Sequence, residues 1–255
     1  MPLVLTPLGG IPLIKPGDNL SEIIQQSLIS NEINLKEGDI LVLAQKIVSK
    51  AEGQLVNLST VNPSERAYKY AQITEKDPRL VELILRDSSK VLRTRPGLII
   101  VEHRLGFICA NSGIDHSNVK GDWGVPDDWY LLLPKEPDLS AKIIREWFKQ
   151  SFSIDIGVLI IDSHGRAWRQ GTIGMCIGLS GIPGVVDFRG KRDLFNYELK
   201  VTEVGAADEL AGAASLVMGQ AAEGFPVVHV RGFPYPLRES ALEELIRPKE
   251  KDLFR

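Results

Sequence analysis

Apolar residues recur along the chain in two patterns that predict different elements. In residues 20–30 they fall three and four positions apart, which is the spacing of one helical face. Residues 40–48 instead form a continuous run rich in Val, Ile and Leu, which predicts a buried strand. The same criteria predict strands at 3–6, 98–103, 106–110, 130–133, 157–161, 171–184 and 227–230, and helices at 138–150 and 205–218.

Prolines and glycines refine this pattern. Pro63 predicts the first position of a helix with Asn62 as its cap, and a second helix is expected after Pro78. The glycines within 171–184 predict strands that another backbone approaches closely. From Arg238 onward the chain is charged, and we expect a surface helix or a frayed tail.

Strands and helices mix without a regular βαβ alternation. The pattern therefore predicts an α+β or irregular α/β fold, not a doubly wound sheet. We expect one domain over residues 1–237, followed by the charged tail 238–255. The polar loop 111–128 is the best candidate for a break between two substructures within that domain.

Composition narrows the class of protein. The chain has 255 residues, 44% hydrophobic and 25% charged, with a net charge of −3, which is ordinary for a globular protein and lacks the basic surplus of a nucleic-acid binder. Cys109 and Cys176 lie far apart in apolar surroundings, so we expect reduced core cysteines. No apolar run is long enough to span a bilayer, and the N-terminal segment 1–14 lacks the basic start of a signal peptide and is broken by Pro and Gly, so a cytoplasmic location is expected.

Two segments place acids where a chain turn follows a strand. Asp115 and Asn118 emerge from the loop after a predicted strand, and Asp162 and Ser163 end another. Carboxylate, amide and hydroxyl oxygens are ligands for hard cations such as Mg²⁺ or Mn²⁺. The alternative at each position is ordinary turn chemistry, in which these side chains bond only their own backbone.

Two further segments suit an anionic ligand. Residues 217–226 form a glycine loop whose N–H groups would cradle phosphates, or alternatively a plain helix C-cap. Lys46 and Lys50 would share one face of a strand and bind the anion there. Alternatively, they would lie on a polar strand edge and protect it against aggregation. Basic residues at 166, 169, 189, 191 and 192 would serve phosphates or carboxylates, although a solvated face is the commoner role. A P-loop motif is absent from the sequence, so any nucleotide site is of another kind.

Taken in order, these segments resemble the F420-0:gamma-glutamyl ligase family. The resemblance is carried by residues 7–14, 45–53, 62–66, 111–118, 161–166, 177–181, 189–194, 207–211 and 218–220, and it extends to about residue 232. Each motif is weak singly, but so many in register are specific. It implies two interleaved substructures with a cleft between them and an intertwined homodimer.

The resemblance also implies an activity: GTP-dependent addition of L-glutamate to the deazaflavin precursor F420-0 through an acyl phosphate. It implies two divalent cations (Mg²⁺ or Mn²⁺), with K⁺ in some members, held at positions matching Asp115, Asp162, Ser163 and Gln220. Lys46 and Lys50 would stabilise phosphate, and no residue is assigned to covalent or acid–base catalysis. The nucleotide would contact Gly10, Ile11, Pro12, Leu13, Gln45, Lys46, Lys50, Asn118, Met218, Gly219, Gln220, Ala221, Ala222, Glu223, Gly224 and Phe225.

Two positions depart from the expected pattern. Gln220 would hold a cation more weakly than Glu would, and Ser163 stands where Thr is often expected. The motifs serve nucleotide and metal, so a ligase acting on another carboxylate and a non-catalytic GTP-binding protein stay open as alternatives. No motif in the sequence distinguishes GTP from ATP.

Overall fold

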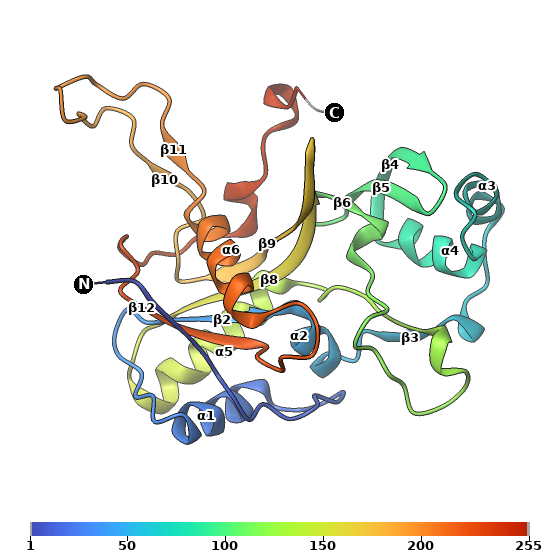
Figure 1. Ribbon diagram of the computed structural model, residues 1–255, viewed down its shortest axis with the longest axis horizontal. Helices are drawn as coiled ribbons and strands as arrows, with labels where there is room; N and C mark the ends of the chain where they lie inside the picture. The colour runs from blue at the N-terminus through green and yellow to red at the C-terminus, as the bar shows by residue number, and fades with distance from the viewer. Residues whose placement is uncertain (1, 254–255) are drawn as a thin grey trace.

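The computed structural model describes residues 2–253 and is built on a five-stranded mixed sheet (Figure 1). The strands lie in the order β1, β12, β2, β8, β9, with β2 and β8 parallel and every other neighbouring pair antiparallel. Their bounds are β1 Val4–Pro7, β12 Val227–Arg231, β2 Ile40–Ala44, β8 Gly157–Arg166 and β9 Arg169–Ser180. Each lies at or beside a strand predicted from the apolar pattern.

Helices bury this sheet. They are α1 Leu20–Ser30, α5 Pro137–Phe152 and α6 Ala206–Met218, all predicted from the sequence. At Gly174 a Cβ atom would lie 2.4 Å from the carbonyl oxygen of Ala211 in α6, and at Gly178 it would lie 2.5 Å from Pro137 of α5. The close backbone approach predicted for the glycines of β9 is therefore confirmed at these two positions.

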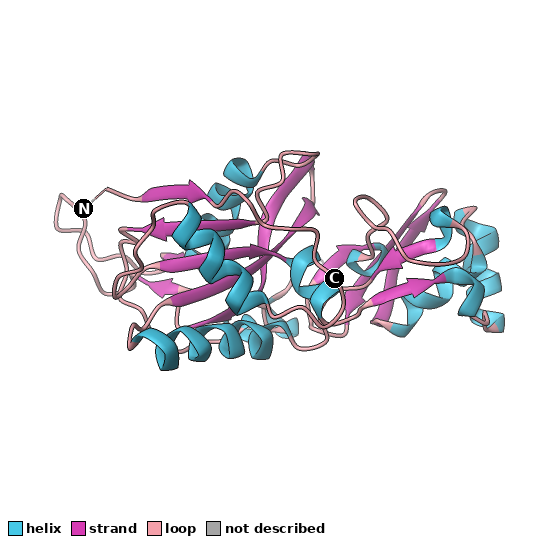
Figure 2. Cartoon of the chain, turned by 90° about the horizontal axis from the view of Figure 1, so that it is seen from below, coloured by secondary structure: helices cyan, strands magenta, loops and turns pink. Residues whose placement is uncertain are grey.

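A smaller lobe lies beside the sheet, as Figure 2 shows. It is formed by residues between α2 and α5. Its strands and helices are β3 Leu55–Asn57, β4 Ser88–Arg95, β5 Leu98–His103, β6 Ile108–Ala110, β7 Trp129–Leu131, α3 Glu65–Thr74 and α4 Pro78–Arg86, with 3₁₀ turns at Leu58–Thr60, Asn111–Gly113 and Pro126–Asp128. The fold is thus mixed α+β with several sheets, as expected; the predicted domain limits stay predictions.

The predicted strand 40–48 is wrong in its second half. β2 ends at Ala44, and Gln45–Ala51 form the helix α2. Polar residues interrupt the apolar run from Gln45 onward, and the Ser49 hydroxyl donates to Gln45 Oε1 across one helical turn, 2.8 Å away. Lys46 and Lys50 still share one face, because residues four apart are also neighbours on a helix.

Other local predictions need smaller corrections. The cap of α3 is Ser64, whose hydroxyl accepts from the Ala67 N–H at 3.2 Å, and not Asn62. β4 was missed because Lys and Arg interrupt its apolar positions. The tail beyond Arg238 contains 3₁₀ turns at Leu242–Leu245 and Lys249–Lys251. Both cysteines are buried free thiols, as expected, and no helix within residues 2–253 is long and apolar enough to cross a membrane.

A long excursion of the chain projects from the body and was not predicted (Figure 1). We call residues 186–204 the arm; its base is the strand pair β10 Val186–Asp187 and β11 Glu203–Val204. Ion pairs of Arg189 with Asp187 and Glu203 close that base. Beyond it, Leu194 and Phe195 are 98% and 89% exposed, so the arm carries apolar side chains away from the core.

Candidate active site

The parallel strand β2 ends beside the middle of β8, at one edge of the central sheet. Ala44 of β2 pairs with Ile161 of β8, so the next residues, Gln45 and Asp162, lie at the same edge. β2 turns there into α2, whereas β8 continues outward against β9. Ligands of open α/β sheets bind at edges of this kind. The sheet therefore brings the start of α2 next to Asp162 and Ser163.

Asp115 reaches this edge from the smaller lobe. Its backbone N–H and C=O both pair with Leu131 at 2.9 Å, which fixes the loop beside β7. Its carboxylate oxygen Oδ2 lies 2.5 Å from Gln45 Nε2 and 2.5 Å from Lys46 Nζ. The Ser49 hydroxyl, by donating to Gln45 Oε1, leaves the amide N–H of Gln45 directed at Asp115.

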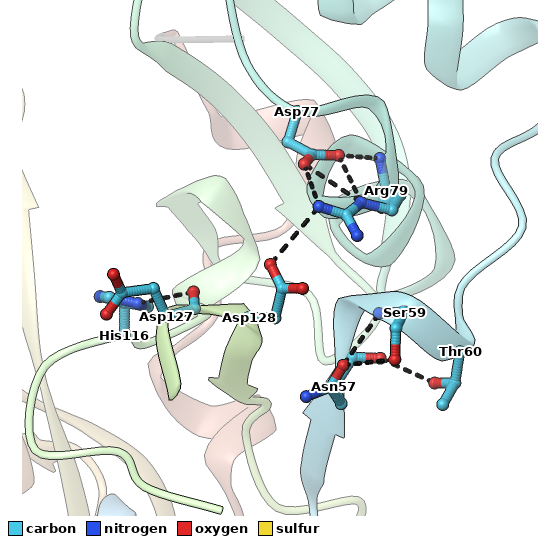
Figure 3. Close-up of polar contacts among 8 residues, drawn as sticks. All are labelled: Asn57, Ser59, Thr60, Asp77, Arg79, His116, Asp127 and Asp128. Carbon is cyan, nitrogen blue, oxygen red and sulfur yellow. Dashed lines mark hydrogen bonds and ion pairs between the residues drawn. The ribbon is translucent and has the colours of Figure 1, made fainter. Parts of the chain in front are cut away.

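The loop that carries Asp115 is anchored to the smaller lobe by polar contacts (Figure 3). Arg79 binds the carboxylates of Asp77 and Asp128, at 2.7 and 3.4 Å. The His116 Nε2 atom lies 3.1 Å from the carbonyl oxygen of Asp127. The imidazole of His116 is therefore engaged within its own loop, although it follows Asp115 in sequence.

Asp162 is held by His164 two residues along the same strand. His164 Nε2 donates to Asp162 Oδ2 at 3.0 Å. The ring of His164 is buried against Phe107, which in turn stacks on His103 with ring centroids 4.9 Å apart. Burial, with Arg104 and His164 nearby, lowers the pKa of His103 to about 3, so that ring stays neutral. This aromatic column fixes His164 and, through it, the carboxylate of Asp162.

Ser163 points to the opposite side of β8 and meets the end of α6. Its hydroxyl donates to Gln220 Oε1 at 2.9 Å, and Gln220 Nε2 donates to the Ser215 hydroxyl at 2.9 Å. The amide oxygen of Gln220 therefore faces Ser163. Asp115, Asp162, Ser163 and Gln220, far apart in the sequence, line one small cavity of about 210 Å³.

The electrostatics of this cavity are set by two neighbouring carboxylates. Burial raises the pKa of the Asp115 carboxyl, against the opposing effect of the Lys46 ammonium, and the charge of Asp162 raises it further. Burial also disfavours the charged form of Asp162, but the hydrogen bond and charge of His164, the Ser163 backbone N–H and the charge of Lys46 together outweigh it and lower the pKa of Asp162. A cation between two such carboxylates would relieve their repulsion.

These four residues fit a hard divalent cation. Within residues 2–253 no group of three or more His, Cys, Asp and Glu side chains gathers as a metal site. The set here instead combines two carboxylates with a hydroxyl and an amide, all of them oxygen donors that Mg²⁺ or Mn²⁺ prefers. The donor chemistry agrees with the expected ligands, and the metal itself stays a prediction.

A larger cavity of about 580 Å³ adjoins the small one and shares Lys46, Asp162, Ser163 and Gln220 with it. It is bounded by the two loops predicted to hold a nucleotide and by the start of α2. Of the predicted nucleotide-binding residues, those lining it are Ile11, Pro12, Leu13, Gln45, Lys46, Lys50, Asn118, Met218, Gly219, Gln220, Ala221, Ala222, Glu223, Gly224 and Phe225. Gly10 alone lies outside the lining, at a turn with φ +78°.

Polar contacts tie the walls of the larger cavity together. Lys50 Nζ donates to the carbonyl oxygen of Asn118 at 2.8 Å, and Asn118 Nδ2 donates to the carbonyl oxygen of Ala221 at 3.1 Å. Burial, with the charge of Lys46, lowers the pKa of Lys50. The Glu223 carboxylate accepts from the Ala221 N–H at 2.8 Å. The smaller lobe thereby closes over the loop that follows α6.

Sequence reasoning missed several residues of this site. Lys120 adds a third lysine to the lining of the larger cavity, and Ser215 orients Gln220. Ser215 is a polar residue in an otherwise Ala-rich helix, which is a signal that pattern reading can use. Lys120 follows Asn118 in a loop with no periodicity, so nothing in the sequence separated it from other surface lysines.

Comparison with known proteins decides the family. A family model described as F420-0:Gamma-glutamyl ligase matches residues 10–232. The chain belongs to the F420-0:gamma-glutamyl ligase family. The resemblance drawn from the separate motifs is therefore confirmed, and the cavities described above lie within the matched residues.

Relatives within this ligase family are similar over nearly their whole length. The chain is 42% identical to the coenzyme F420:L-glutamate ligase of Methanothermobacter thermautotrophicus over 100% of both chains. It is 43% identical to that of Methanopyrus kandleri over 95% of this chain and 93% of the relative. It is 39% identical to that of Archaeoglobus fulgidus over 98% and 95%.

Proposed function

We propose that the protein is a GTP-dependent ligase that joins L-glutamate to F420-0 in the biosynthesis of coenzyme F420. The observation that carries this proposal is the junction of the two cavities, where Lys46, Asp162, Ser163 and Gln220 face both spaces. Membership of the ligase family and the names of the relatives support the reaction and its substrates. The larger cavity has the volume of a nucleotide-sized ligand site.

The chemistry follows from that junction. The terminal carboxylate of F420-0 attacks the γ-phosphorus of GTP, the bond to the β-phosphate breaks, and GDP leaves with the bonding electrons. The product is an acyl phosphate, whose carbonyl carbon is attacked by the deprotonated amine of glutamate. The amide C–N bond forms as the C–O bond breaks and phosphate leaves.

The protein's part in this reaction is positioning and charge neutralisation, which dominate phosphoryl transfer. Lys46 and Lys50 lie one helical turn apart on α2 and face the larger cavity, where their ammonium groups would bind phosphate oxygens. Asp115, Asp162, Ser163 and Gln220 would hold Mg²⁺ or Mn²⁺. Such an ion, when bound, neutralises negative charge on the transferring phosphoryl group. K⁺ is a further expected ion for which no residues are assigned.

We also propose that the active protein is a homodimer in which the arm packs against a second copy. The exposed apolar residues Leu194, Phe195 and Val201 support this proposal, because a side chain of this size is usually covered in a stable assembly. The arm stands clear of its own chain's core, so only another molecule can cover those residues (Figure 1).

Mass spectrometry of the reaction product tests the proposed function. Purified protein with GTP, Mn²⁺, L-glutamate and F420-0 is expected to yield a product heavier by one or more glutamyl units. The variant Lys50→Met is expected to slow product formation at least tenfold, because a phosphate-binding ammonium is lost. A product formed equally well with ATP would overturn the nucleotide assignment, and a product formed only from another carboxylate would overturn the acceptor.

A further inference from the structure

Lys120 lines the larger cavity from the smaller lobe, whereas Lys46 and Lys50 line it from α2. Asp115 holds the ammonium group of Lys46 at 2.5 Å, and the carbonyl oxygen of Asn118 accepts from that of Lys50. The side chain of Lys120 is exposed and forms no hydrogen bond or ion pair with any other residue in the described range 2–253. Of the three ammonium groups, that of Lys120 is therefore available to a ligand without the loss of a contact within the protein.

Contacts on both sides of Lys120 fix the chain at that point. Two residues before it, Asn118 Nδ2 donates to the carbonyl oxygen of Ala221 in the loop after α6. One residue after it, a Cβ atom at Gly121 would lie 1.9 Å from the ring of Trp129, so only glycine fits there. Trp129 is buried, and its indole N–H donates to a carbonyl oxygen of the same loop at 2.7 Å. The backbone at Lys120 is thus held at the wall of the cavity by its neighbours on either side.

The charges along the larger cavity favour an anionic ligand. Three lysines line it, against the carboxylates of Asp162, a predicted metal ligand, and Glu223, which accepts from a backbone N–H of its own loop. A chain of phosphates is the part of a nucleotide that ammonium groups bind, because each phosphate carries negative charge. Lys120 does not line the small cavity, where the predicted metal ligands gather, which favours the nucleotide over the other substrates as its ligand.

We propose that Lys120 binds a phosphate group of the nucleotide from the smaller lobe, while Lys46 and Lys50 bind from α2. This proposal rests on the proposed function, since it takes the nucleotide of that reaction as the ligand. Lys120 is thereby a further nucleotide-binding residue. Both parts of the molecule that bound the larger cavity then supply positive charge to the phosphate chain.

Titration of the full-length protein with GTP, GDP, GMP and guanosine, with Mg²⁺ present and F420-0 omitted, tests the proposal. Lys120→Met keeps most of the aliphatic side chain and removes its charge. The variant is expected to weaken GTP binding about tenfold, because a charge-assisted contact to phosphate is lost. Guanosine, which has no phosphate, should bind both proteins equally. The shortest nucleotide that still shows the loss identifies the phosphate that Lys120 contacts.

Two further variants isolate the charge of Lys120. Lys120→Arg is expected to retain most of the GTP affinity, since a guanidinium group carries the same charge. Lys69→Met is the matched control, because Lys69 is an exposed lysine of α3 in the same lobe and lines neither cavity. It should bind GTP as the unmodified protein does. The difference in GTP affinity between Lys120→Met and the unmodified protein should shrink at high salt, which screens exposed charges.

The proposal is overturned if Lys120→Met binds GTP as tightly as the unmodified protein, or if it loses affinity for guanosine by the same factor. An equal loss in Lys69→Met would also overturn it, since only the net charge of the lobe would then matter. A raised KM for glutamate with unchanged GTP affinity would assign Lys120 to the amino acid instead. If Lys120→Met weakens GTP binding but the unmodified protein forms no glutamylated product, the proposed reaction fails and the phosphate contact stands. If the unmodified protein binds no GTP, both proposals fail.

Discussion

At the scale of single residues, the cation affinity of the predicted metal site depends on its carboxylates, of which it has only two. Its carboxylates are Asp115 and Asp162, and the remaining oxygen donors are the neutral groups of Ser163 and Gln220. Lys46 lies 2.5 Å from Asp115, so an ammonium already offsets part of the negative charge. Affinity for a divalent cation should therefore respond strongly to one added carboxylate.

Gln220→Glu is expected to lower the Mn²⁺ or Mg²⁺ concentration that gives half-maximal activity, because a carboxylate replaces a neutral amide oxygen among the ligands. The measurement is a metal titration of ligase activity. Leu216→Glu is the control, since it adds the same charge at an exposed position in the last turn of α6. An equal effect of both variants would show that only net charge matters.

His164 is expected to act through Asp162. His164→Phe should raise the metal concentration required about 10–100-fold, the usual effect of removing a partner of a metal ligand. His164→Gln, whose amide can also donate to the Asp162 carboxylate, should recover part of the loss. Metal titration with the nucleotide held saturating is the readout. A change in stability without a change in metal requirement would contradict this positioning role.

At the scale of elements, a buried polar cluster joins β12 to the start of β2. Asp39 is buried and accepts hydrogen bonds from His229 Nε2 at 2.8 Å and from Arg231 Nε at 2.9 Å. Burial opposes ionisation of Asp39, but the hydrogen bonds from Arg231 and His229 lower its pKa below the usual value. The cluster fixes β12 against the start of β2.

Asp39→Asn is expected to reduce the free energy of unfolding by about 3 kcal/mol, because it leaves buried donors without a charged acceptor. A carboxyl whose folded pKa is lowered stabilises the protein above its unfolded pKa, near 3.9. That contribution is lost as the pH falls below about 4 towards the folded pKa, and the variant should lack this dependence. Denaturant unfolding at several pH values measures both effects.

Asp187→Asn is the control for that experiment. Asp187 is paired with Arg189 at the exposed base of the arm, where solvent screens the interaction. It is expected to leave stability and its acid dependence unchanged. A loss of stability equal to that of Asp39→Asn would show that the buried cluster contributes no more to the free energy of unfolding than an exposed ion pair does.

Periodicity identified the core strands and most helices because burial of one face leaves a regular apolar pattern. It failed at Gln45–Ala51, where Ile47 and Val48 were assigned to the preceding strand although polar residues at 45 and 46 separate them from it and the segment is a helix. It also failed for β4, whose alternation is broken by charged residues, and for the arm, whose apolar residues contact no core. These are positions where long-range contacts, not local pattern, decide the structure.

For the candidate site too, local pattern identified individual residues, whereas long-range contacts decided which of them meet. Asp162 and Ser163 were found because they follow the apolar run 157–161, and Asp115 because a glycine turn precedes it. The predicted strand end at Asp162 is wrong, since β8 continues to Arg166 through its pairing with β9. Their meeting with Gln220 depends on strand register and on the placement of the smaller lobe, which no local pattern contains.

At the scale of the whole molecule, the arm is the feature that one chain alone does not explain. Phe195→Ser is expected to shift the protein from dimer towards monomer, because it removes apolar surface that a second copy would cover. Light scattering coupled to size exclusion measures the molar mass. The control is Leu253→Ser, at an equally exposed position outside the arm. A monomeric unmodified protein would contradict the proposed assembly.

The measurement that bears most directly on the proposed ligase is GDP release by the unmodified protein with GTP, Mn²⁺, L-glutamate and F420-0, omitting each component in turn. Release is expected to require all four, with one GDP formed for each glutamate joined, because the acyl phosphate forms on the acceptor and is consumed by the amine. GDP release that does not depend on F420-0, or no release with all four present, would contradict the proposed reaction.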